Sequence, residues 1–115
     1  MDKFKIEIEV DVDFLDCVMV TALEGGINYW VDDVIYPENE ECDRMRASTI
    51  VATTEHSIVI VDCEGDPHNL NREKLLKGLN MYAQEHGIST DAGQIDATAA
   101  DLIIQFALFG EIVYG

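Results

Sequence analysis

The chain has 115 residues, of which 48% are hydrophobic, and its 23 acidic and 7 basic side chains give a formal net charge of −16. This length predicts a single domain over residues 1–115 with one modest core, and the excess of carboxylates excludes a conventional nucleic-acid-binding or anionic-membrane-binding surface. No apolar run approaches the roughly 20 residues that span a bilayer, and the N-terminus lacks the apolar core of a signal peptide, so neither is expected.

The acidic residues are concentrated in the first half of the chain. Residues 1–66 carry a formal charge of −13, and residues 67–115 carry −3. A surface of this kind attracts basic proteins, including those whose grooves normally hold nucleic acid. The alternative interpretation is that the charge only keeps a small protein soluble.

The first half of the chain is predicted to contain one strand, one helix and one further extended segment. Residues 4–10 alternate apolar and charged side chains, which is typical of a half-buried strand. Residues 13–24 have apolar side chains at helical spacing and predict a helix. Residues 27–35 are predicted to be extended, with a turn at Asp32 and Asp33 that breaks the segment as an alternative. Residues 37–46 form a polar loop and the most acidic local stretch.

The second half begins with two runs rich in β-branched residues, 48–53 and 57–62, which predict a hairpin. Residues 63–69 are rich in turn-forming residues and predict a break. Apolar spacing then predicts a helix between positions 71 and 87 and another over residues 98–109, followed by a short extended tail.

Polar caps and glycines mark where these helices are expected to begin and end. The expected first caps are Asp13, Asn71 and Thr98, and the expected terminating glycines are Gly25, Gly26, Gly87 and Gly110. Helices with one apolar stripe must pack against another layer. The sequence therefore predicts an α+β two-layer sandwich, in which about three helices cover one face of a mainly antiparallel sheet of about four to five strands.

One short phrase occurs twice. Residues 22–30 (ALEGGINYW) and residues 107–115 (ALFGEIVYG) share Ala, Leu, Gly, Ile and Tyr in the same columns. Each copy predicts the last turn of a helix, a left-handed glycine and the start of an extended segment. The two corners are expected to lie side by side in the sheet, with Tyr29 and Tyr114 on related faces.

The strongest candidate for metal chemistry is the segment 62–68. Asp62, Glu64, Asp66 and His68 alternate along it and could offer ligands to a divalent cation, but the EF-hand pattern is absent and a turn explains the composition equally well. The sequence contains no recognised catalytic, nucleotide-binding or zinc-binding spacing, so no cofactor and no bound metal are expected.

The three cysteines are widely spaced and odd in number, which favours free thiols in a reducing compartment. Cys17 lies within an apolar helical stretch and is expected to be buried.

An aromatic pair beside acidic residues is the best candidate for partner binding. In a strand, Tyr29 and Trp30 face opposite sides, so one enters the core and the other stays exposed. An exposed aromatic ring beside carboxylates suits Arg and Lys of a partner, whereas a buried Trp30 would only fill a gap between helix and sheet. The predicted partner-binding residues are Tyr29, Trp30, Asp32, Asp33, Glu38, Glu40, Glu41 and Asp43.

The phrases ALEGGINYW and ADLIIQFALFGEIVYG, with LNREKLLKGL between them, resemble a group of uncharacterised small acidic proteins encoded by bacteriophages and other bacterial mobile elements. The resemblance covers most of the chain and is densest at the two corners. It implies a mobile-element context and a bacterial cytoplasm, and it brings no catalytic residues with it.

These observations predict a non-enzymatic protein that binds the basic surface of a nucleic-acid-binding protein. The most specific version is an inhibitor of a host defence system, of the anti-CRISPR or anti-restriction type, that imitates the charge of DNA. One alternative is a small phage housekeeping or structural protein that acts through homo-oligomer contacts. Another is a metal-dependent enzyme that uses the acids of the segment 62–68.

Overall fold

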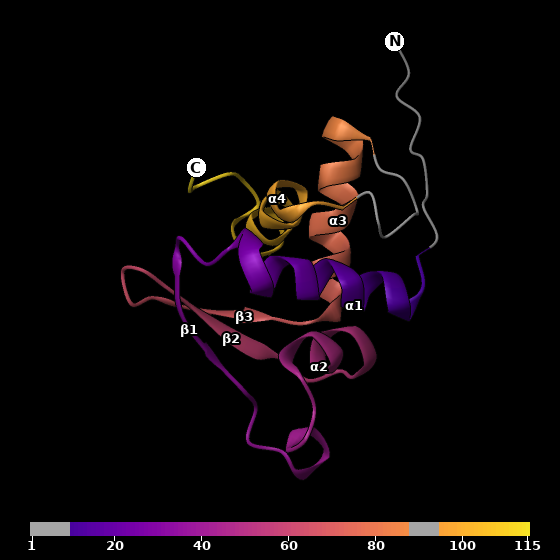
Figure 1. Ribbon diagram of the computed structural model, residues 1–115, viewed down its shortest axis with the longest axis vertical. Helices are drawn as coiled ribbons and strands as arrows, with labels where there is room; N and C mark the ends of the chain where they lie inside the picture. The colour runs from indigo at the N-terminus through magenta and orange to yellow at the C-terminus, as the bar shows by residue number, and fades with distance from the viewer. Residues whose placement is uncertain (1–9, 88–94) are drawn as a thin grey trace.

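The computed structural model describes residues 10–87 and 95–115 (Figure 1). The elements in chain order are helix α1 (Val12–Thr21), π-helix η1 (Ala22–Gly26), strand β1 (Val31–Ile35), 3-10 helix η2 (Glu40–Cys42), helix α2 (Ala47–Thr53), strands β2 (Ile58–Asp62) and β3 (Pro67–Leu70), and helices α3 (Arg72–His86) and α4 (Ala97–Phe109). In this part of the chain, no helix is both long enough and apolar enough to cross a membrane.

The three described strands form one antiparallel sheet in the order β1-β2-β3. In the central strand, Ile58, Ile60 and Asp62 are buried while Val59 and Val61 are only half-buried, so one face of the sheet meets the core. Figure 1 shows α1, α3 and α4 above the strands and α2 beside one end of β2. The predicted α+β class with an antiparallel sheet is confirmed, but the described residues form three strands and four α-helices.

Helix α2 occupies the segment 48–53, for which a strand and a hairpin were expected, so that prediction is wrong. Ile50 and Val51 are fully buried on a face that packs against α1. The Thr54 hydroxyl donates to the Ile50 carbonyl at 2.7 Å, and Thr53 donates to the carbonyl four residues before it in the same way. Packing against α1 therefore overrides the preference of β-branched residues for strands.

Other boundaries also differ from the expected ones. The break expected at residues 63–69 ends early, because Pro67–Leu70 pairs with β2 as β3. The extended segment expected over residues 27–35 starts only at Val31, after a turn. The C-terminal tail does not join the described sheet. The strand expected at residues 4–10 lies outside the described residues, apart from Val10.

Three helix ends follow the local rules used to predict them. The Asn71 side chain accepts a hydrogen bond from the Lys74 backbone N–H at 2.9 Å and caps α3. Gly87 and Gly110 end α3 and α4 with positive φ angles of 68° and 71°. These positions need glycine because other residues rarely adopt that backbone conformation.

Two predicted caps are displaced by two residues. Asp11 rather than Asp13 caps α1, and Asp96 rather than Thr98 caps α4, in each case by accepting a backbone N–H at 2.8 Å. Several acidic or hydroxyl residues near each helix start can accept such a bond, so composition alone does not select the cap.

The left-handed glycine expected at the first corner is wrong. Gly25 and Gly26 have no positive φ, and the helix continues through them as η1. A Cβ at Gly26 would lie 2.8 Å from the Ala97 carbonyl oxygen, whereas a Cβ at Gly25 would meet nothing within 4 Å. Gly26 is therefore required by close packing against the start of α4.

Helix α3 packs closely against α4 at Gly78. A Cβ at this position would lie 2.4 Å from the Ile103 carbonyl oxygen and 2.6 Å from the Ala107 backbone nitrogen. The contact fixes α4, and α4 in turn carries the polar residues that organise the aromatic corner described below.

Candidate partner-binding surface

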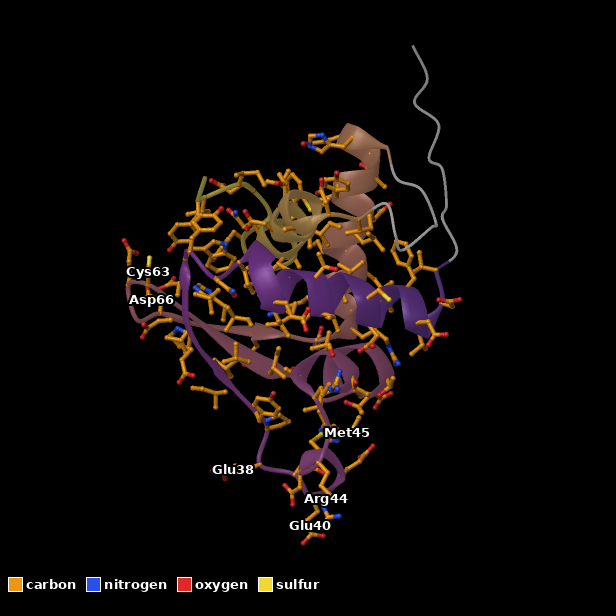
Figure 2. The ribbon with its side chains drawn as sticks, in the orientation of Figure 1. Glu38, Glu40, Arg44, Met45, Cys63 and Asp66 are labelled. Atoms are coloured by element: carbon orange, nitrogen blue, oxygen red, sulfur yellow. The ribbon has the colours of Figure 1, made fainter. Side chains whose placement is uncertain are left out.

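All six predicted acidic residues are exposed. Asp32 and Asp33 lie on β1, and the other four lie in the following loop and around η2. Figure 2 shows Glu38 and Glu40 at the end of the molecule where this loop projects away from the helices. The structure thus places the acids along one continuous segment, on a strand and then a loop, and does not gather them into a compact cluster.

Basic side chains do not neutralise these acids. Within residues 10–87 and 95–115, no Lys or Arg nitrogen lies within 4 Å of a carboxylate oxygen, and the pairs at that distance all involve histidine. One of them joins His56 to Glu41 at 3.2 Å. Arg44 and Arg46 follow η2 and are exposed as well. The carboxylates therefore remain available to an external cation.

The aromatic pair divides as expected between core and solvent. Trp30 is 1% exposed, so it cannot serve as the anchor of a partner in this conformation. Tyr29 is 58% exposed, so of the two aromatic residues it is the one that a partner could reach. Its hydroxyl donates to Asp101 Oδ2 at 2.5 Å, which restrains the ring, while more than half of the residue is exposed. A rigid exposed ring is a favourable anchor because little side-chain entropy is lost on binding.

A buried polar network on α4 supports this pair. Asp101, which is 7% exposed, also accepts hydrogen bonds from Trp30 Nε1 at 2.8 Å and from Gln105 Nε2 at 2.9 Å. Desolvation of the hydroxyl, together with the hydrogen bond to Asp101 and the charge of that residue, raises the pKa of Tyr29 to about 12. Within the described residues, the three partners of this carboxylate are all neutral donors, so the burial of Asp101 is tolerated only when all three hydrogen bonds are made.

Gln105 joins the two copies of the repeated phrase. Its Oε1 accepts the backbone N–H groups of Val113 and Tyr114, each at 2.8 Å, and its Nε2 donates to the Tyr114 carbonyl oxygen at 3.0 Å. The Tyr114 ring stacks on Trp30 with centroids 5.1 Å apart and 5° between the planes. The corners do lie side by side, but a side-chain amide and stacked rings join them outside the sheet.

The segment 62–68 is a hydrogen-bonded turn. Asp62 Oδ1 accepts the N–H groups of Glu64 and Asp66 at 2.9 and 3.0 Å, and its Oδ2 lies 2.9 Å from His68 Nε2. The His68 hydrogen bond, followed by the two backbone donors, lowers the pKa of Asp62 against the opposing effect of burial. Oxygens of Asp62, Glu64 and Asp66 lie within 4.8 Å of one another. Both Asp62 oxygens already accept hydrogen bonds within the turn, so the turn by itself explains why these three acids lie close together.

The three cysteines are free thiols, as expected, but their burial differs from the expectation. Cys17 is exposed on α1, so its predicted burial is wrong, while Cys42 beside η2 is buried. Burial, followed by the charges of Glu41 and Asp43, raises the pKa of the Cys42 thiol. That thiol stays protonated and poorly reactive at neutral pH.

Sequence reasoning missed Asp101 and Gln105. Neither residue was expected to be buried or to organise a site. Their signal is nevertheless present, because two polar residues four positions apart interrupt an otherwise apolar helix and so share its buried face. The chain matches no protein-family model, no curated protein and no solved structure.

Proposed function

We propose that this chain is a non-enzymatic acidic binding protein whose partner is the basic surface of a nucleic-acid-binding protein. The observation that supports the proposal best is the row of six exposed carboxylates along β1 and η2, none of which has a Lys or Arg partner in the described part of the chain. Because no Lys or Arg of the described residues competes for these carboxylates, a basic surface can approach them without displacing an internal Lys or Arg.

The most specific form of the proposal is an inhibitor of a bacterial defence nuclease, of the anti-CRISPR or anti-restriction type. The excess of negative charge supports it, because a groove that binds phosphates also attracts carboxylates. The resemblance to small acidic phage and mobile-element proteins supports the same context, and with it a bacterial cytoplasm as the place of action. Tyr29 would supply a rigid aromatic contact at one end of the acidic segment.

The test is capture of a defence nuclease complex from bacterial lysate, followed by identification of the bound protein. We expect a nucleic-acid-binding protein that is retained at low salt, released at high salt and displaced by duplex DNA. No retention at low salt would contradict the proposal.

A pair of charge variants tests whether the location of the acids matters. The test variant carries amides in place of the acids at positions 32, 33, 38, 40, 41 and 43. The control variant carries amides at six other exposed acids, at positions 13, 24, 55, 73, 85 and 111. Both lose the same net charge, so only the test variant should lose the partner. Equal losses would show that total charge acts without any specific surface.

A second candidate function is a homo-oligomeric phage protein assembled through the joined corners. Its support is the exposed apolar surface there, since Tyr29, Ile112 and Val113 are 58%, 43% and 52% exposed. Sedimentation at high salt separates this candidate from the first, because apolar association persists when charge is screened. Replacing Ile112 and Val113 by Ser should then dissociate the oligomer.

A further inference from the structure

The outward face of the sheet is apolar where solvent-facing sheets are usually polar. The pairing register places Asp33, Ile35, Val59, Val61, Pro67 and Asn69 on this face, which we name the open sheet face. Four of these six residues are apolar. Ile35 is 47% exposed, Pro67 is exposed, and Val59 and Val61 are half-buried. Alternation normally puts polar residues on a solvated face, so this face has the composition of an interface.

The rim of the open sheet face is acidic. Asp33 lies on the face itself, Asp32 is its neighbour on β1, and Glu64 and Asp66 border the face at the turn that joins β2 to β3. The three strands and that turn contain no Lys or Arg. Lys74 lies beside β3, where its Nζ donates to the Asn69 carbonyl oxygen at 2.9 Å, near the end of that strand away from the turn. Figure 2 shows Asp66 projecting at the turn end of the sheet.

We propose that the open sheet face is the docking surface for the basic partner, and that the partner places apolar side chains flanked by Lys or Arg on it. This inference rests on the proposed function and assigns its contact to a surface that includes Asp33 but extends beyond the acidic loop. Charge complementarity selects this occupant over a second copy of the chain, because each copy carries −16 and would bring like charges together across the face.

The experiment compares two synthetic peptides of equal charge. One alternates Lys with Leu and Val, and the other alternates Lys with Ser and Thr. We expect the apolar peptide to bind the full chain about tenfold more tightly, because it also removes apolar surface from water. Methyl resonances of Ile35, Val59 and Val61 should shift on binding.

Matched variants locate the contact. Ile35→Thr with Val59→Thr should abolish the advantage of the apolar peptide, since threonine keeps the strand preference but not the apolar surface. Val12→Thr with Leu76→Gln removes two other exposed apolar side chains, one on α1 and one on α3, and should leave the advantage intact.

Each remaining outcome overturns the inference in a distinguishable way. Equal binding of both peptides, with shifts confined to residues 36–43, would refute the open sheet face and leave the charge-based function standing. No binding of either peptide at low salt would refute both. Methyl contacts in the free protein between Val59 or Val61 and residues 1–9 would identify the chain's own N-terminus as the occupant. Self-association that the open-face variant abolishes would identify a second copy.

Discussion

Replacing Gly78 by Ala should destabilise the protein through the contact between α3 and α4. The added Cβ would lie 2.4 Å from the Ile103 carbonyl oxygen, 2.6 Å from the Ala107 nitrogen and 2.7 Å from its Cβ. Two of these atoms belong to the backbone, so no side-chain rotation relieves the overlap. Overpacking of this kind costs about 3 kcal/mol, and the helix preference of alanine returns about 1 kcal/mol. The expected net loss of about 2 kcal/mol lowers Tm by roughly 8 °C.

Gly25→Ala is the matched control. A Cβ there meets nothing within 4 Å, so this variant gains only the helix preference and should be up to about 1 kcal/mol more stable than the native chain. Urea unfolding followed by circular dichroism gives both values, and their difference isolates the overlap from the intrinsic preference. A difference below about 1 kcal/mol would refute the close approach of α3 and α4 at this point.

Two further predictions concern the polar groups of the site. Gln105→Leu removes the oxygen that accepts the backbone N–H groups of Val113 and Tyr114. It should lower the free energy of unfolding by about 1–3 kcal/mol and shift the fluorescence emission of Trp30 to longer wavelength. The control Gln84→Leu, on the exposed side of α3, should change neither quantity. The pKa of Asp62 is lowered in the folded state, so its stabilisation is present above the unfolded value of about 3.9 and is lost as pH falls through the folded pKa. Asp62→Asn should therefore reduce the loss of stability on acidification below about pH 4, measured by urea unfolding. If the native chain and the variant lose the same stability between about pH 4 and pH 2, the lowered pKa of Asp62 would be contradicted.

The parts of the fold that sequence predicts well are those decided by neighbouring residues. The cap of α3 at Asn71 and the end of α4 at Gly110 depend only on groups within four or five positions. The alternation in β2 likewise needs only a sheet with one buried face. In each of these three cases one local conformation is much more favourable than the others, so the sequence alone predicts it.

The parts that sequence misses are decided by distant contacts. Helix α2 contains the run STIVAT, which favours a strand locally, yet its buried face is stabilised by packing against α1. Gly26 was interpreted as a helix stop, but its requirement comes from the Ala97 carbonyl, which lies more than seventy positions later. No local pattern carries that information.

The candidate site shows the same division. The exposure of the six acids follows from charge alone, because isolated carboxylates are expensive to bury. The burial of Trp30 depends on finding an acceptor for its indole N–H, and that acceptor is Asp101 on α4. The sequence could state that one of the two aromatic residues would be buried, but only the position of Asp101 decides which.

The hydrogen bond between Trp30 and Asp101 also has a consequence for how the chain folds. These residues are 71 positions apart, whereas β1 with β2 and β2 with β3 are joined by much shorter segments. Short closures form early because they lose less chain entropy, so α4 should dock last. Trp30 is the single tryptophan of the chain. Its change in emission during refolding should therefore follow the final docking step, while circular dichroism reports the earlier ones.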